Sequence, residues 1–338
     1  MPKMNIQKIL FFKPGAIGDF LHTLPALAQL RKQFPAALVT VVISSGQEAL
    51  IEGTAIADEI IVFDKSALKK QFRAFFDLAL RLRQEHYDLF VDLQPSLRSR
   101  FLRMMAGARH SLVYRKQKWV RKGGRRLHAV ENFLETLAPL GVTPEDTEIR
   151  LPLRPEAQDV AEAFLSRVGA SGSRPIIALN CSVGAARPAR NWSPVRFTEL
   201  ANRLIKELGA TVVFVGGRED RSLVQSVMAK MKETAQSAAG ELSLPETAAL
   251  LARCRCLVSS DTGPLHLSTA VGTPVVGLFG STDPRRTGPV GRGHSVLTAS
   301  LSCIPCEEKA CPAGTRACMD AITVDSVVAT VRDILLCE

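Results

Sequence analysis

Three loops carry the residues whose types and spacing could do chemistry. The first, residues 13–19 (KPGAIGD), follows the apolar run Ile9–Phe12. Gly15 and Gly18 let the backbone turn tightly and approach a ligand. The loop lacks the Gly-Lys-Ser/Thr ending of a P-loop and the third glycine of a dinucleotide fingerprint. Asp19 stands at the expected start of a helix, where it either caps that helix or accepts a proton from a substrate hydroxyl.

The second loop, residues 259–266 (SSDTGPLH), joins an expected strand to a helix whose first position is a proline. Exposed amides at such a helix start attract phosphate. Thr262 adds a hydroxyl beside them, and Gly263 leaves room for the ligand. Asp261 either shapes the turn or serves the ligand. His266, on the first helical turn, either packs and caps there or faces the same ligand.

The third loop, residues 180–194, is rich in small residues and follows another expected strand end. Ser182 and Arg190 in this loop make it a further candidate surface for an anion. After the next strand, a carboxylate often binds the ribose hydroxyls in nucleotide-binding folds. Glu219 and Asp220 both fit that place, and the sequence does not choose between them.

Four cysteines are clustered with the spacing Cys303-x2-Cys306-x4-Cys311-x6-Cys318. Four thiolates within so short a segment could hold a structural zinc or iron ion. The spacing matches neither a zinc ribbon nor a standard ferredoxin, so free or partly oxidised thiols are the alternative. In neither case do we expect the cluster to be a catalytic metal site.

These loops need strands that end where the loops begin. Short apolar runs alternate with amphipathic stretches along the chain, which is typical of βαβ units and a parallel sheet. The expected strands are Ile9–Phe12, Leu38–Ile43, Glu59–Phe63 and Leu89–Asp92, and then Ile176–Leu179, Thr211–Val215, Cys256–Ser259 and Pro274–Phe279. The expected helices are Phe20–Gln33, Ser66–Glu85, Leu97–Ala106 and Ala129–Leu140, and then Pro194–Leu208, Asp220–Lys232, Pro245–Arg253, Pro264–Val271 and Val324–Leu336.

A chain of 338 residues suits two domains better than one. Residues 141–155 are rich in proline and acidic residues and form the expected linker. We therefore predict an α/β protein with Rossmann-like domains at 1–150 and 151–322, and a terminal helix within 323–338. Parallel sheets that face each other across a cleft would bind ligands between the carboxyl ends of their strands.

The net charge of +10 is concentrated in one block. Eleven Lys or Arg and no Asp or Glu lie between Leu93 and Val130, so the other 300 residues carry −1. Such a block implies an anionic partner: nucleic acid, an acidic membrane surface or a phosphorylated substrate. It contains no recognised nucleic-acid motif, so a nucleic-acid-binding protein is a remote alternative and we expect no nucleic acid partner. No signal peptide or membrane-spanning segment is visible, which predicts a cytoplasmic protein.

The motifs together resemble glycosyltransferase family 9, the bacterial heptosyltransferases of the lipopolysaccharide inner core, and are closest to the second-heptose transferases. The resemblance covers nearly the whole chain. It rests on residues 13–19 with the following HTLPAL (22–27), on DTGPLH (261–266) and on GSTDP (280–284). Three such motifs, in the right order at strand ends, are highly specific.

The resemblance implies a GT-B fold and an inverting, metal-independent transfer of heptose from ADP-heptose. It places the acceptor on the amino-terminal domain, the donor on the carboxyl-terminal domain, and the last helix back on the first domain. The catalytic base falls on Asp19, and the diphosphate turn falls on Asp261, Thr262 and Gly263. Arg190 stands where the family commonly has a lysine, and the arginine preserves the positive charge at that position. The carboxylate that binds the ribose falls near Glu219.

The acceptor implied by the resemblance is a lipid-anchored, anionic saccharide at the inner face of the inner membrane. We expect Gly15, Gly18 and three arginines after a strand end to bind it: Arg98, Arg100 and Arg103. The stretch from Arg115 to Arg126 would meet the anionic membrane surface. The enzyme would need no cofactor. Another nucleotide-sugar transferase of the same fold, acting on a different surface glycan or on a protein, is the alternative.

Overall fold

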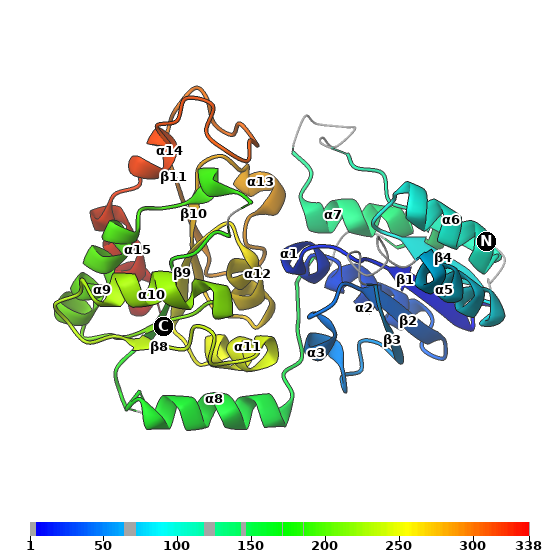
Figure 1. The fold of residues 1–338 in the computed structure, drawn as a ribbon, viewed down its shortest axis with the longest axis horizontal. Coiled ribbons are helices and arrows are strands. Elements are labelled where there is room, and N and C mark those ends of the chain that lie inside the picture. The colour runs from blue at the N-terminus through cyan, green and yellow to red at the C-terminus, as the bar shows by residue number, and fades with distance from the viewer. Residues whose placement is uncertain are drawn as a thin grey trace. The chain divides into compact units, whose positions relative to one another are not determined.

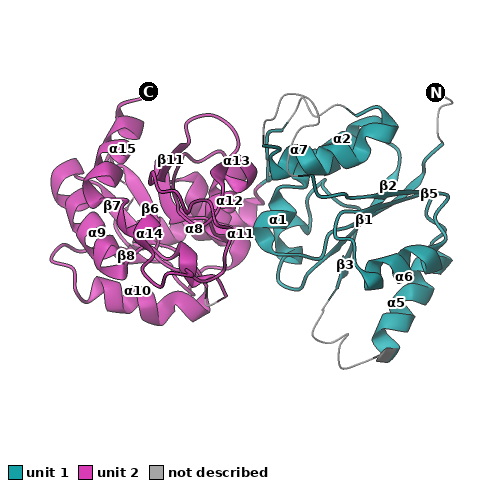
Figure 2. Ribbon diagram, turned by 90° about the horizontal axis from the view of Figure 1, so that it is seen from above, with its two compact units in different colours: residues 1–152 teal, residues 153–338 magenta. Residues whose placement is uncertain are grey.

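The computed structural model describes residues 5–63, 72–117, 126–142, 147–170, 172–184 and 186–337. The chain divides into two compact units, with the boundary between Pro152 and Leu153 (Figure 2). This boundary lies within the expected linker and two residues beyond the expected domain limit. No helix in the described ranges is long and apolar enough to span a bilayer.

Unit 1 is built on a parallel sheet of five strands in the order β3-β2-β1-β4-β5 (Figure 1). Central β1 is almost entirely buried because its residues are apolar on both faces, as parallel sheets covered by helices require. The strands are β1 (Lys8–Phe12), β2 (Leu38–Ile43), β3 (Glu59–Val62), β4 (Leu89–Asp92) and β5 (His110–Val113).

Helices cover both faces of this sheet, with α2 and α7 on one side and α5 and α6 on the other (Figure 2). The helices are α1 (Ile17–Leu21), α2 (Leu24–Gln33), α3 (Glu48–Ile51), α5 (Phe72–Gln84), α6 (Leu97–Ala106) and α7 (Ala129–Leu134), followed by the 3₁₀ helix η1 (Glu135–Leu140).

Two helices expected in unit 1 are each divided in the structure. The helix predicted at Phe20–Gln33 is α1 and α2, because the hydroxyl of Thr23 donates to the carbonyl of Phe20 and a proline occupies the first turn of α2. The helix predicted at Ala129–Leu140 is α7 and η1, since Pro139 has no amide to donate. Residues 66–71 of the predicted helix Ser66–Glu85 lie outside the described residues.

Unit 2 is built on a parallel sheet of six strands in the order β11-β10-β9-β6-β7-β8. The strands are β6 (Ile176–Asn180), β7 (Thr211–Phe214), β8 (Gln236–Ser237), β9 (Cys256–Ser260), β10 (Val275–Phe279) and β11 (Ser295–Thr298). The helices are α8 (Pro155–Arg167), α9 (Pro194–Leu208), α10 (Arg221–Met228), α11 (Leu244–Ala252), α12 (Gly263–Ala270), α13 (Pro284–Thr287), α14 (Ala317–Asp320) and α15 (Val324–Leu336), with 3₁₀ turns η2 (Pro188–Arg190) and η3 (Arg218–Asp220).

The terminal helix α15 packs in unit 2. Val327, Val328 and Val331 are buried in the same core cluster as α9 and strands β6, β7, β9 and β10. We expected this helix to pack on the amino-terminal domain. Its valines recur at helical spacing, so they form one apolar face, and that face is used inside the core of unit 2.

Candidate functional site

Asp19 presents an exposed carboxylate in the first turn of α1, just beyond the carboxyl end of β1. The helix begins at Ile17, and Ala16 is its N-cap residue. The expectation that Asp19 caps the helix is therefore wrong, because the helix starts three residues earlier than predicted. Among the described residues, no side chain or amide is hydrogen-bonded to this carboxylate, which leaves it available to a ligand.

A buried lysine shapes the loop before Asp19. Lys13 is 2% exposed, and its Nζ donates to Oε1 of Gln94 at 2.6 Å and lies 5.4 Å from the ring centroid of Phe133. A Cβ on Gly15 would come within 2.8 Å of that Nζ. The missing side chain at position 15 therefore makes room for Lys13. The second expected glycine, Gly18, is buried within α1.

The three arginines expected to bind the acceptor all lie on α6, but they do not act as one group. Arg98 and Arg100 are exposed. Arg103 instead pairs with the buried carboxylate of Asp92, with Nη1 3.3 Å from Oδ2. Burial raises the pKa of Asp92, and hydrogen bonds from Ser99 and the Gln94 amide and the Arg103 charge only partly offset that effect. Arg103 therefore balances a buried carboxylate at the end of β4.

In unit 2, Asp261 is the centre of a buried charged cluster at the carboxyl end of β9. Its side chain is 3% exposed, and its Oδ2 lies 3.2 Å from Nη1 of Arg190. The same Nη1 donates to the Asp261 carbonyl oxygen at 2.5 Å. Nε2 of His266 lies 3.3 Å from Oδ1, and the hydroxyl of Thr287 donates to Oδ2 at 3.4 Å. The structure thus brings together Arg190, Asp261 and His266, which the sequence places in two separate loops.

The electrostatics of this cluster favour an ionised Asp261. Burial raises the pKa of the carboxyl, but the hydrogen bond and charge of His266, the charge of Arg190 and a hydrogen bond from Thr282 outweigh it, so the pKa lies below its ordinary value. The cluster is therefore a buried anion held between two basic side chains.

Helix α12 begins beside this cluster with its first amides uncapped. Thr262 is the N-cap residue, but its side chain makes no capping hydrogen bond. Its Oγ1 instead accepts from Nδ2 of Asn180 at 2.9 Å. The orphan amides at the start of α12, with Gly263 as its first residue, are therefore open to an acceptor such as a phosphate oxygen.

Asn180 is a residue that the sequence analysis did not single out. It ends β6, and its Nδ2 also donates to Oγ of Ser259 and to the carbonyl oxygen of Ser182, each at 3.1 Å. One amide therefore fixes Ser182, β9 and the start of α12. The sequence signal that could have identified Asn180 was a polar residue directly after the apolar run Ile176–Leu179.

The structure distinguishes the two carboxylates after β7. Oδ2 of Asp220 accepts from the amide of Gly217 at 2.8 Å, so this side chain closes its own turn. Glu219 is exposed. A Cβ on Gly217 would come within 2.6 Å of Oε2 of Glu219, so the glycine gives that carboxylate its space. Glu219 is thus the more exposed of the two carboxylates, and Asp220 is the one with a partner in its own turn.

All four clustered cysteines line one cavity of about 140 Å³ in unit 2. Hydrogen bonds from four backbone amides, that of Arg316 foremost, lower the pKa of Cys311. The cysteine loop is fastened to the loops that follow β10 and β6, because the amide of Glu307 donates to the carbonyl oxygen of Ser281 and the amide of Ala189 donates to that of Lys309. Within the described ranges, no three His, Cys, Asp or Glu side chains are arranged to hold a metal ion.

We expect the purified protein to carry only substoichiometric zinc or iron at Cys303, Cys306, Cys311 and Cys318, because their spacing matches neither a zinc ribbon nor a standard ferredoxin. Elemental analysis of protein prepared without chelator, with thiol titration beside it, measures this. One equivalent of metal that disappears in a variant with all four cysteines changed to serine would contradict the expectation.

Two Rossmann-like α/β units, each built on a parallel sheet with helices on its faces, are the architecture of the GT-B fold. The sequence profile of glycosyltransferase family 9 (heptosyltransferase) matches residues 75–316. The chain belongs to this family and is a glycosyltransferase, as the sequence motifs predicted.

Known proteins similar to this chain agree with the assignment. The lipooligosaccharide heptosyltransferase 2 of Haemophilus ducreyi is 25% identical over 98% of this chain and 100% of its own. The family 9 glycosyltransferase of Veillonella parvula has a TM-score of 0.84 and 26% identity, covering 99% and 98% of the two chains. The Escherichia coli ADP-heptose heptosyltransferase II has a TM-score of 0.76 at 21% identity, covering 98% and 99%.

Proposed function

We propose that this protein moves a heptose from ADP-heptose to the inner core of lipopolysaccharide, with inversion at the anomeric carbon and without a metal ion. The observation that carries the proposal is the Asp261 cluster beside the uncapped start of α12. Orphan amides and a guanidinium match the two negative groups of a nucleoside diphosphate. The names of the similar proteins supply the sugar and the acceptor class.

The reaction requires one proton acceptor and a set of fixed donors. The acceptor hydroxyl oxygen forms a bond to the anomeric carbon while the bond from that carbon to the diphosphate oxygen breaks. Asp19 takes the hydroxyl proton as general base, and ADP leaves with the electron pair of the broken bond. Attack from the side opposite ADP gives inversion. An exposed carboxylate to which no described residue is hydrogen-bonded suits Asp19 to this role.

Charge that grows on the departing diphosphate is stabilised by groups already in place. The first amides of α12 donate hydrogen bonds, and Arg190 supplies a positive charge whose position Asp261 fixes. One well-placed donor of this kind contributes about 3–4 kcal/mol in other enzymes. Glu219 would accept from the ribose hydroxyls, and Ser182, held by Asn180, would line the same side.

The acceptor is proposed to be a lipid-anchored, anionic saccharide bound by unit 1. Arg98 and Arg100 are its candidate partners, with Gly15 in the loop before α1 and Gly18 beside Asp19 within α1. Arg103 supports them through the helix that it anchors to Asp92. Such an acceptor places the enzyme in the cytoplasm, at the inner face of the inner membrane. The expected membrane contact of Arg115 to Arg126 falls mostly on residues 118–125, outside the described residues.

We expect ADP to bind at least about tenfold more tightly than UDP or GDP, which corresponds to about 1.4 kcal/mol. The diphosphate contacts are common to all three nucleotides. The difference in affinity therefore comes from contacts that the rest of the donor site makes to the base. Isothermal titration calorimetry with the three nucleotides measures the difference. Equal affinity for UDP, or no binding of ADP, would remove ADP-heptose as the donor.

A further inference from the structure

Helices α5 and α6 of unit 1 expose four large apolar side chains. Phe76 is 45% and Leu80 52% exposed on α5, while Leu97 is 86% and Met104 69% exposed on α6. Their exposure does not come from an incompletely packed core. The opposite sides of the same helices are already buried in the core cluster of unit 1, through Ala79, Leu82, Leu102 and Ala106.

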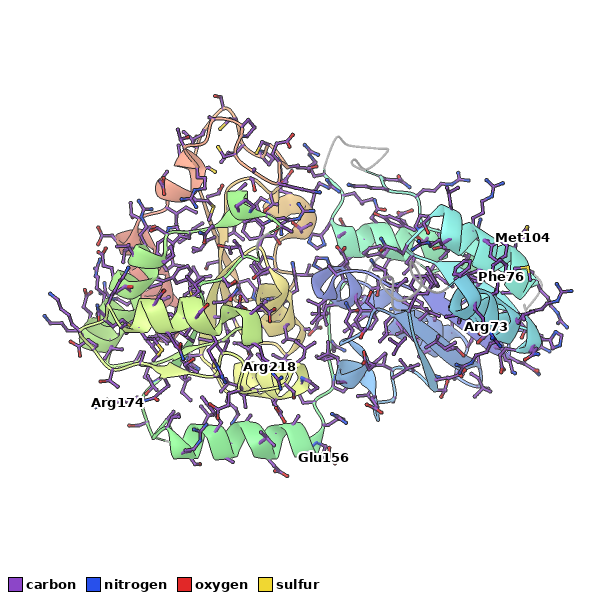
Figure 3. All side chains as sticks on the ribbon, viewed as in Figure 1. Arg73, Phe76, Met104, Glu156, Arg174 and Arg218 are labelled. Carbon is purple, nitrogen blue, oxygen red and sulfur yellow. The ribbon has the colours of Figure 1, made fainter. Side chains whose placement is uncertain are left out.

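The exposed residues form one continuous surface, which we call the α5–α6 face. Phe76 and Leu80 are four positions apart and therefore lie on one side of α5. Leu97 and Met104 are seven positions apart, two turns along one side of α6. The two helices pack against each other, and the ring of Phe76 meets that of Phe101 edge to face at 5.7 Å. Figure 3 shows Phe76 and Met104 at the same edge of the unit, with Arg73 nearby.

The charge of the α5–α6 face is strongly positive. The two helices hold six arginines and one aspartate. Arg81 pairs with Glu59 and Arg103 with Asp92. The other four arginines, which are all exposed, are Arg73, Arg83, Arg98 and Arg100. Arg73, Phe76, Leu80 and Arg83 follow one another at helical spacing along α5, so cations stand at both ends of the apolar stripe.

We propose that the α5–α6 face is the surface by which this enzyme docks on an anionic lipid bilayer. Apolar side chains on a helix surface enter the boundary between headgroups and acyl chains, and flanking arginines reach the lipid phosphates. Each basic residue near an anionic leaflet adds about 1 kcal/mol. A second copy of the chain would instead bring the same arginines against each other. The inference rests on the proposed function, because a lipid-anchored acceptor lies in such a bilayer.

The apolar part of the face is tested by the triple variant Leu80→Ser, Leu97→Ser and Met104→Ser. We expect its partitioning onto vesicles of phosphatidylglycerol and phosphatidylethanolamine to fall about tenfold or more, because three apolar side chains no longer leave water on binding. The matched control is Val160→Ser, Val195→Ser and Leu336→Ser, which removes comparably exposed apolar side chains from unit 2. Co-sedimentation measures both proteins, and the control should bind as the unaltered protein does.

The cationic part is tested by Arg73→Glu with Arg83→Glu, compared with Arg121→Glu, Lys122→Glu, Arg125→Glu and Arg126→Glu in the basic block. We expect the first variant to lose binding to phosphatidylglycerol vesicles, and added salt to mimic the loss. Vesicle binding that survives in both the triple-serine and the Arg73/Arg83 variants would overturn the proposal. So would a dimer that the triple-serine change dissociates while vesicle binding is unchanged.

Failure of the proposed function is measured separately. ADP titration and heptose transfer to a delipidated acceptor use neither the vesicle nor the side chains of Leu80, Leu97 and Met104. The triple-serine variant should retain both, which also shows that it is folded. If the unaltered protein transfers no heptose but its vesicle binding still depends on Leu80, Leu97 and Met104, the docking surface stands and the donor or acceptor assignment fails.

Discussion

Asp19→Asn should lower the rate of heptose transfer by about 10²–10⁴-fold and leave the affinity for ADP unchanged. A general base contributes a factor of this size when it takes a proton in the transition state. The amide of asparagine has nearly the same shape as the carboxylate but cannot accept that proton. Because the Asp19 side chain is exposed and no described residue is hydrogen-bonded to its carboxylate, the substitution removes no contact of the fold.

The measurement is initial-rate kinetics with saturating ADP-heptose, together with calorimetric titration of ADP. Asp159→Asn is the matched control, since Asp159 is an exposed aspartate on α8. It should be neutral in both assays. If Asp19→Asn turned over at the rate of the unaltered enzyme, another group would have to be the base. If the variant lost ADP affinity and thermal stability together, position 19 would be structural.

The central strands and the loops that follow them could be predicted because their sequences are locally distinctive. β4, β6 and β9 are short apolar runs that end in polar residues, and the apolar run of β1 is followed directly by Lys13. The strands that sequence reasoning missed are three of the four edge strands of the two sheets, β3 being the edge strand that was predicted. β5 is half exposed, β8 has only two residues, and β11 alternates partly buried with exposed positions. Edge strands need less apolar surface, so their sequences resemble loops.

The parts of the site that sequence reasoning missed depend on contacts between distant residues. The pairing of Arg103 with Asp92 required the packing of α6 on β4, and nothing in the spacing announced it. Asn180 reaches a threonine 82 residues away in the sequence. Asp220 differs from Glu219 through a hydrogen bond from the backbone amide of Gly217, which the sequence does not show. Residue type identified the candidates, and three-dimensional neighbours determine which of their polar atoms already have partners within the fold.

Arg190→Met should lower both the free energy of unfolding and the affinity for ADP. The substitution removes one of the two basic side chains that offset the negative charge of the buried Asp261 carboxylate. Removal of one partner of a buried ion pair costs about 3–5 kcal/mol in other proteins. Arg190 is 18% exposed, so we expect a loss near the lower end, about 3 kcal/mol of unfolding free energy at pH 7. ADP affinity should fall at least about tenfold, since charge-assisted hydrogen bonds to phosphate contribute about 1.5–3 kcal/mol.

The pH dependence of this loss has a definite sign. Asp261 has its pKa lowered in the folded protein, so its ionised form stabilises the fold above the ordinary aspartate pKa of about 3.9, and that stabilisation is lost as pH falls through the folded pKa. Arg190 contributes to the lowering. The stability deficit of Arg190→Met should therefore be greatest near pH 7 and shrink as pH falls below about 4, because a protonated Asp261 no longer needs the guanidinium.

Urea unfolding at pH 7 and at about pH 3, below the ordinary aspartate pKa, measures the deficit, with Arg190→Lys as the control that keeps the charge. The double variant Arg190→Met with Asp261→Asn should recover much of the stability that Arg190→Met loses, because it removes the buried charge itself. Such recovery identifies the pair, rather than lost packing of the arginine stem, as the cause. A deficit that is the same at both pH values and unchanged in the double variant would assign the effect to packing and leave Arg190 only its role toward the nucleotide.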